Sequence, residues 1–160
     1  DKITSEYAAC DGHLDCLKYA HENGCPWDEL TCENAARNGH LECLKYAHEN
    51  GCPWDKRSCR YAAMYGHLDC LKYLHQNGCP WDETTCSVAA EFRHLECLKY
   101  VHENGAKMNK YTCHFAAKNG LKQEVQMLLD AGADKNLKNI SNETAADIAR
   151  TDEIRDLINS

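Results

Sequence analysis

The chain has 160 residues, of which 43% are hydrophobic, and this is enough apolar material for a folded core. Its 18 Lys and Arg residues stand against 25 Asp and Glu residues, so the formal net charge is −7. That balance gives no general attraction to phosphate backbones or anionic membranes, so we expect neither nucleic acid nor a membrane as partner.

A repeat of 27 residues organises the chain from its first residue. Gly-His-Leu recurs at this interval and becomes Arg-His-Leu in the fourth copy, and the Cys-Leu-Lys-Tyr segment recurs in phase with it. Five copies begin at Asp1, Asp28, Asp55, Asp82 and Asn109. Such repetition predicts a stacked array, in which each copy buries its apolar side against its neighbours.

Each copy predicts two helices, and the second copy shows the signals clearly. Asp28 is a good N-cap for a first helix over residues 29–37, here named helix A, and Gly39 ends it. A second helix, helix B, follows over residues 40–49, and Pro53 cannot continue it. The predicted fold class is therefore all-α, with about six stacked helix-turn-helix pairs.

The C-terminal segment departs from the regular period. We predict one domain over residues 1–160, with copies at 1–27, 28–54, 55–81 and 82–108, a longer copy at 109–139 and a terminal cap at 140–160. Two short helices are expected in the cap, over residues 143–150 and 152–158. Only the stretch 134–144 is long enough for a β-hairpin.

The repeat resembles the ankyrin repeat. The resemblance rests on Ala-Ala-x-x-Gly-His before a Leu-rich helix, and on Leu-Leu-Asp-Ala-Gly-Ala-Asp at residues 128–134. The other copies resemble a shortened form, Cys-Pro-Trp-Asp-Glu-x-Thr-Cys-x-x-Ala-Ala, found in arrays of large DNA viruses and protists. Ankyrin repeats usually have about 33 residues and a hairpin finger. The resemblance thus implies a solenoid whose fingers are mostly absent, and a cytoplasmic adaptor whose helices A line a concave groove.

Comparison of the copies divides helix A into two halves. Counted from the first residue of each copy, positions 4, 5, 8 and 9 hardly change, whereas positions 2, 3, 6, 7, 10 and 11 vary. At roughly 100° per residue the two sets lie on opposite sides of the helix. The varying half carries aromatic residues, Met and Arg, which interface centres favour. The candidate partner-binding residues are Tyr7, Arg57, Arg60, Tyr61, Met64, Tyr65, Val88, Phe92, Tyr111 and Phe115.

These residues favour recognition of another protein by a monomeric module, with Tyr61, Tyr65 and Phe92 on one exposed ridge. In the alternative reading, the aromatic residues only pack against one another and the next repeat. Helix B recurs almost unchanged, and this favours a second alternative, a structural scaffold or designed consensus repeat without a partner.

Twelve cysteines and nine histidines raise a third alternative, a thiol or metal buffer. A tetrahedral zinc site needs four ligands about 2.0–2.3 Å from one point, whereas neighbouring helices pack about 8–10 Å apart. We therefore expect small, buried, reduced cysteines in an intracellular compartment, with no metal or other cofactor.

The remaining repeated residues are predicted to be structural. The family resemblance implies that His13, His40, His67 and His94 brace the turn before helix B by hydrogen bonding. We expect His21 and its equivalents to be half-buried between copies, and Trp27 to fill the gap left by the missing hairpin. A ligand box of stacked tryptophans is the alternative.

No catalytic constellation stands out. Almost every reactive residue recurs in phase, whereas one active site needs one nucleophile and one base. The sequence has no Gly-rich phosphate-binding motif, no Gly-x-Ser-x-Gly and no His-Glu-x-x-His. We therefore expect that the chain is not an enzyme.

Overall fold

The computed structural model describes residues 1–130 and 132–160, and it describes Lys110 by its backbone alone. The described residues contain α-helices and no β-strand, which confirms the predicted all-α class. The helices are α1 (Lys2–Cys10), α2 (Leu14–Glu22), α3 (Glu29–Asn38), α4 (Leu41–Glu49), α5 (Lys56–Met64), α6 (Leu68–Gln76), α7 (Glu83–Glu91), α8 (Leu95–Glu103), α9 (Lys110–Asn119), α10 (Lys122–Asp130) and α11 (Asp152–Asn159). Among them, none combines the length and hydrophobicity that a membrane-spanning segment requires.

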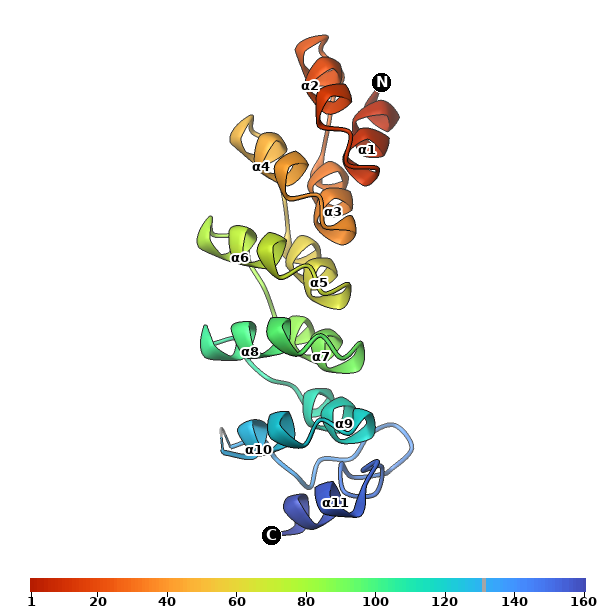
Figure 1. Cartoon of the computed structure of the whole chain (residues 1–160), viewed down its shortest axis with the longest axis vertical. Helices are drawn as coiled ribbons and strands as arrows, with labels where there is room; N and C mark the ends of the chain where they lie inside the picture. The colour runs from red at the N-terminus through yellow and green to blue at the C-terminus, as the bar shows by residue number, and fades with distance from the viewer. Residues whose placement is uncertain (131) are drawn as a thin grey trace. The chain divides into compact units, whose positions relative to one another are not determined.

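Two compact units make up the chain, Asp1–Trp81 and Asp82–Ser160. The division falls at the predicted boundary between the third and fourth copies. In the first unit, the helices A (α1, α3 and α5) form one row and the helices B (α2, α4 and α6) form a second row beside it (Figure 1). Each helix A also contacts the helix B of its own copy.

Local signals set the helix ends close to their predicted positions. The Asp28 carboxylate accepts a hydrogen bond from the Leu30 backbone N–H at 3.0 Å, which caps α3 as predicted. At the other end, Gly39 adopts φ 77°, a left-handed conformation that favours glycine. Helix α4 begins one residue later than predicted because His40 takes the N-cap position.

The steady half of helix A forms the core, as the sequence predicts. Its small side chains let the helices A approach one another closely. In the second and third copies all eight residues at positions 4, 5, 8 and 9 are fully buried: Thr31, Cys32, Ala35, Ala36, Ser58, Cys59, Ala62 and Ala63.

The histidines that open helix B cover the turn of the preceding copy. A Cβ placed on Gly12 would lie 2.4 Å from Nδ1 of His40, and one on Gly39 would lie 2.5 Å from Nδ1 of His67. Any larger residue at either glycine would therefore force the histidine ring to move. Neither His40 nor His67 caps its own helix through its side chain, and each ring lies against the glycine turn of the preceding copy.

The short linkers between copies are filled by aromatic rings. The imidazole of His48 stacks on Trp54 with centroids 3.7 Å apart, and its Nδ1 lies 2.9 Å from the Tyr73 hydroxyl. The arrangement repeats one copy earlier with His21 and Trp27, whose centroids are 3.9 Å apart. These histidines are half-buried, as predicted. Histidine and tryptophan thus occupy the space between copies that a hairpin would otherwise cover.

The second unit ends in a cap that differs from the prediction. Helices α9, α10 and α11 share one apolar cluster, to which Ala145, Ala146 and Ala149 contribute. The predicted helix over residues 143–150 is wrong, because those residues form a turn. The described residues therefore hold five helix pairs and the single α11, one helix fewer than predicted.

Side-chain hydrogen bonds explain this difference. The Thr144 backbone N–H and hydroxyl both donate to the Asp147 carboxylate at 2.7 Å. These local hydrogen bonds take the place of the backbone hydrogen bonds that a helix would form. The Arg150 backbone N–H donates to the Ala117 carbonyl at 3.1 Å and ties the turn to α9. The stretch 134–144 contains no strand among its residues and forms a loop closed from Asn139 to Glu143. Within the family-like segment 128–134, residue 131 lies outside the described residues.

Candidate protein-binding face

The varying half of helix A is the candidate site, here named the helix-A face and defined as positions 2, 3, 6, 7, 10 and 11 of each copy. The other half of the same helix is buried between copies. In the first unit the face consists of Lys2, Ile3, Glu6, Tyr7, Cys10, Asp11, Glu29, Leu30, Glu33, Asn34, Arg37, Asn38, Lys56, Arg57, Arg60, Tyr61, Met64 and Tyr65.

Four of these residues form one group, the arginine–tyrosine cluster of Arg37, Arg60, Tyr61 and Tyr65. The Arg37 guanidinium lies 5.5 Å from the Tyr61 ring centroid and 5.4 Å from that of Tyr65. Its Nη2 also donates to the Tyr65 hydroxyl at 3.2 Å. Arg60 approaches Tyr61 from its own helix, at 5.2 Å from the ring centroid.

Helix geometry explains how the two tyrosines meet. Tyr61 and Tyr65 are four residues apart, so their side chains lie one above the other on α5 and at its C-terminus. Their rings stack at 6.4 Å with an interplanar angle of 25°. Tyr65 remains 41% exposed and Tyr61 is half-buried, so the cluster is a surface feature rather than part of the core.

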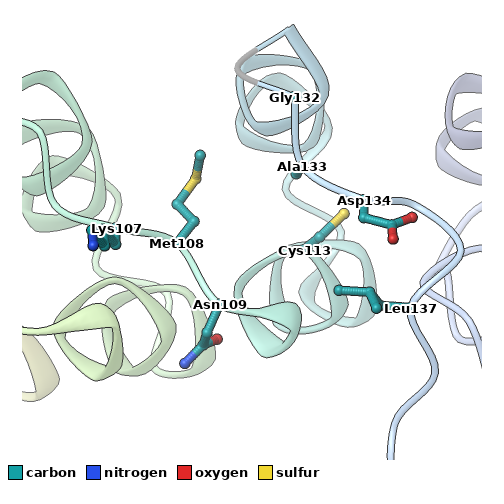
Figure 2. Close-up of a pocket in the computed structure, with 8 residues that line it drawn as sticks. All are labelled: Lys107, Met108, Asn109, Cys113, Gly132, Ala133, Asp134 and Leu137. Carbon is teal, nitrogen blue, oxygen red and sulfur yellow. The ribbon is translucent and has the colours of Figure 1, made fainter.

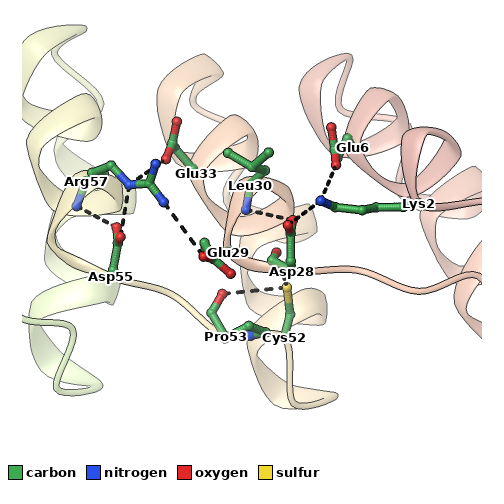
Figure 3. A network of polar contacts seen from close by, with 10 residues as sticks. All are labelled: Lys2, Glu6, Asp28, Glu29, Leu30, Glu33, Cys52, Pro53, Asp55 and Arg57. Carbon is green, nitrogen blue, oxygen red and sulfur yellow. Dashed lines mark hydrogen bonds and ion pairs between the residues drawn. The ribbon is translucent and has the colours of Figure 1, made fainter.

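Arg57 behaves differently from Arg37 and Arg60. Its Nε lies 2.9 Å from Asp55 and 3.3 Å from Glu33, and its Nη2 lies 3.9 Å from Glu29 (Figure 3). Three carboxylates therefore compensate this guanidinium within the chain. Arg57 stays a candidate partner-binding residue, and within the chain its charge joins α3 to α5.

Glu33 is the central carboxylate of that network and is only 8% exposed. Burial raises its pKa above the ordinary value, and the positive charge of Arg57 acts against this shift. Its Oε2 has no aligned hydrogen bond, so the 3.3 Å contact with Arg57 is an ion pair only. The face thus begins with a compensated polar network and ends, at the last turn of the helices, with the arginine–tyrosine cluster.

The remaining candidates are placed unequally. In the first unit Tyr7 is exposed and Met64 is half-buried. In the second unit Phe92 follows α7 and is 48% exposed, and Tyr111 and Phe115 lie half-buried on α9 with ring centroids 6.3 Å apart.

Val88 stands apart from the other candidates, because only 9% of it is exposed. A short β-branched side chain ends close to the helix backbone and presents little area to a partner. The predicted ridge of Tyr61, Tyr65 and Phe92 joins residues of both units. None of the three side chains is buried. Tyr61 and Tyr65 belong to the first unit, and Phe92 belongs to the second.

Arg37 is the functional candidate that the sequence reasoning missed. It occupies position 10 of the second copy, which belongs to the varying half, but the copy as a whole lacks aromatic residues on that half. Its partners Tyr61 and Tyr65 come from the next copy. Comparison of the copies therefore marks this position as variable, but it does not reveal that two tyrosines of the next copy lie beside it.

A hollow in the second unit marks a linker without tryptophan. It has a volume of about 430 Å³ and lies between the linker at Lys107, Met108 and Asn109 and the loop at Ala133 and Leu137 (Figure 2). Met108 stands where the earlier copies have tryptophan. The hollow is thus a packing difference between copies rather than a cluster of polar ligands.

The cysteines mostly serve as core residues. Nine of the twelve are buried, and all twelve are free thiols. Burial raises the pKa of Cys70 and of Cys86 to about 12, so these thiols stay protonated at neutral pH and are weak metal ligands. Among the described residues, no three His, Cys, Asp or Glu side chains are grouped to hold a metal ion.

Comparison with known proteins gives one family and one fold. A family model described as ankyrin repeats (three copies) matches residues 6–84 and again residues 59–139. Comparison with curated protein sequences finds no match. The crystal structure of the human ASB11 ankyrin repeat domain is similar, with a TM-score of 0.81 and 21% identity over 96% of this chain and 80% of that chain. At this identity the likeness concerns the fold alone. Since 343 chains of solved structures match this chain, the fold by itself does not identify a partner.

Proposed function

Because the chain belongs to the ankyrin repeat family, whose repeats generally serve as non-catalytic interaction modules, we propose that it binds another protein through the helix-A face. The observation that carries the proposal is the division of helix A. One half is small and buried, and the other presents Tyr7, Tyr65 and Phe92 to solvent. Exposed aromatic residues beside arginines have the composition of interface centres.

The packing of the copies supports the same proposal. Each helix A is held by buried alanines and by a capping aspartate or asparagine, so its backbone is ordered before any partner arrives. A preordered surface loses little conformational entropy on binding. Little of the free energy gained when a partner covers the exposed rings would therefore be spent on ordering the face.

A second candidate function is that of a structural scaffold without a partner. The near-identity of helix B favours it, since Leu-Glu-Cys-Leu-Lys-Tyr recurs unchanged in α4 and α8.

The main proposal, that of a protein-binding module, has three further parts. They are the shortened viral and protist form of the repeat, a monomeric state and a cytoplasmic location. Twelve free thiols support a reducing compartment.

The experiment is a pull-down from cytosolic extract followed by mass spectrometry. The wild-type chain is compared with a Tyr61→Glu, Tyr65→Glu, Phe92→Glu variant that retains its helical circular dichroism. Tyr19→Glu serves as matched control, because Tyr19 is 70% exposed but lies on helix B.

We expect proteins that the wild type and the control retain and the triple variant loses. Identical sets from all three chains would contradict binding by the helix-A face. The absence of any enriched protein would favour the scaffold.

A further inference from the structure

The acidic chain places two arginines beside each other on the helix-A face. The formal net charge is −7, yet Arg37 and Arg60 meet at the same tyrosine ring on neighbouring helices. No ion pair among the described residues involves either arginine, whereas Arg57 has three carboxylates around it (Figure 3). One arginine of α5 is thus satisfied within the chain and the other is not.

The position of the carboxylates explains this contrast. Glu29 and Asp55 lie at the starts of α3 and α5, while Arg37 lies in the last turn of α3. At 1.5 Å per residue, Glu29 and Arg37 are about 12 Å apart along the helix axis. Glu29 and Asp55 therefore lie near Arg57, and Glu33, whose carboxylate also feels the charges of Arg37 and Arg60, forms its ion pair with Arg57 and none with the two arginines of the cluster.

The two unpaired guanidiniums are held in place by their surroundings. Arg37 lies over two rings and donates one hydrogen bond to Tyr65, so its remaining N–H groups keep a defined direction. The Nε of Arg60 is buried and has no hydrogen-bond partner in the described residues. A buried donor without a partner is a costly feature that an incoming acceptor would relieve.

We infer that the arginine–tyrosine cluster recognises an acidic peptide segment, whose Asp or Glu carboxylates pair with Arg37 and Arg60 while its backbone and side chains cover Tyr61 and Tyr65. The inference rests on the proposed function and adds the chemistry of the partner. Planar guanidinium groups bind carboxylates through two parallel hydrogen bonds, which gives direction as well as strength. A long polyanion such as nucleic acid fits poorly, because it would extend beyond the cluster over a chain whose formal net charge is −7.

The experiment uses the full chain and a phage library of random linear peptides. Enriched peptides are synthesised with a fluorescein label and titrated by fluorescence anisotropy. The wild type is compared with an Arg37→Gln, Arg60→Gln variant. A Lys107→Gln, Lys138→Gln variant is the matched control, because it removes the same charge from exposed positions of the other unit. Circular dichroism verifies that each variant is folded.

We expect acidic peptides to be enriched, and the arginine variant to bind them at least about tenfold more weakly than the wild type and the lysine control. Replacement of Asp and Glu in the peptide by Asn and Gln should cause a similar loss, and added salt should weaken binding. Enrichment of peptides without acidic residues, equal binding to the arginine variant, or no enrichment at all would overturn the inference.

A Tyr65→Ala variant separates this inference from the proposed function. Peptides that lose binding with Tyr65→Ala but not with the arginine variant would leave recognition by the helix-A face intact and remove the acidic partner. Peptides insensitive to both variants would bind elsewhere and contradict the two proposals together.

Discussion

The two halves of helix A are subject to different structural constraints, although they lie on the same helix turns. The half that faces the neighbouring copies holds Thr31, Cys32, Ala35 and Ala36, all without exposed surface. The helix-A face changes from copy to copy and leaves tyrosines and arginines at the surface. The comparison teaches that, within helix A, the repeat fixes the residues that touch the next copy and leaves the others free to acquire a binding role.

The largest effect is expected from a charge placed in the buried half. Ala35→Asp would bury a carboxylate without a partner, and we expect a loss of about 3–5 kcal/mol or no cooperative unfolding. Asn34→Asp, one residue away on the face, should change stability by less than about 0.5 kcal/mol. Urea unfolding of both variants checks the comparison, and equal losses would remove the distinction between the halves.

The turns of the repeat provide a similar test. Gly39 and Gly51 both have a positive φ, at 77° and 84°, so alanine at either costs about 1–2 kcal/mol in backbone strain. Only at Gly39 would the added Cβ also meet a neighbour, Nδ1 of His67 at 2.5 Å. Gly39→Ala should therefore destabilise clearly more than Gly51→Ala in thermal unfolding. The reverse order would show that the histidine does not brace the turn.

The linker residues should produce an intermediate effect. Trp54 stacks on His48, and Trp54→Met should cost about 1–2 kcal/mol, since aromatic pairing and buried area are lost. The opposite change, Met108→Trp, should fill the hollow of the second unit and stabilise by up to about 1 kcal/mol. The urea midpoints of the two variants should move in opposite directions. A loss of stability for both would mean that the hollow is not space for a ring.

The smallest effect concerns Glu33 and depends on pH. Burial raises the folded-state pKa of Glu33, so its contribution to stability is fully present below the unfolded pKa and is lost as pH rises through the folded one. Glu33→Gln cannot ionise and should gain stability relative to wild type between about pH 4 and pH 7. Urea midpoints across this range test the sign. A difference in urea midpoint between Glu33→Gln and wild type that stays constant with pH would contradict the raised pKa of Glu33.

Much of the fold follows from the sequence, because its signals are local and repeat in phase. The cap at Asp28 and the stop at Gly39 need only one copy, and the division of helix A needs only a comparison of the copies in phase. The turn over residues 143–150 could not be anticipated, since it depends on Thr144 and Asp147 bonding to each other and on a tether to α9. Nothing in that short segment repeats, so no second copy could correct the prediction.

The candidate site is predictable only in part, for a related reason. Variation between the copies marks the face as a candidate, and Tyr65 and Phe92 are exposed there. Which arginine is compensated depends on side chains of two copies together. Arg57 meets Glu33 and Glu29 of the preceding copy, and Arg37 meets tyrosines of the following one. Such contacts across copies have no signature in the sequence of either copy alone.

The most direct test of the account is one substitution, Tyr65→Ala, measured for stability and for binding to the partner that the wild type captures. A half-exposed ring that serves the face and not the core should change the unfolding free energy by less than about 1 kcal/mol and weaken binding at least about tenfold. A loss of more than about 2 kcal/mol in stability with binding unchanged would contradict the account, because Tyr65 would then belong to the packing of the repeats.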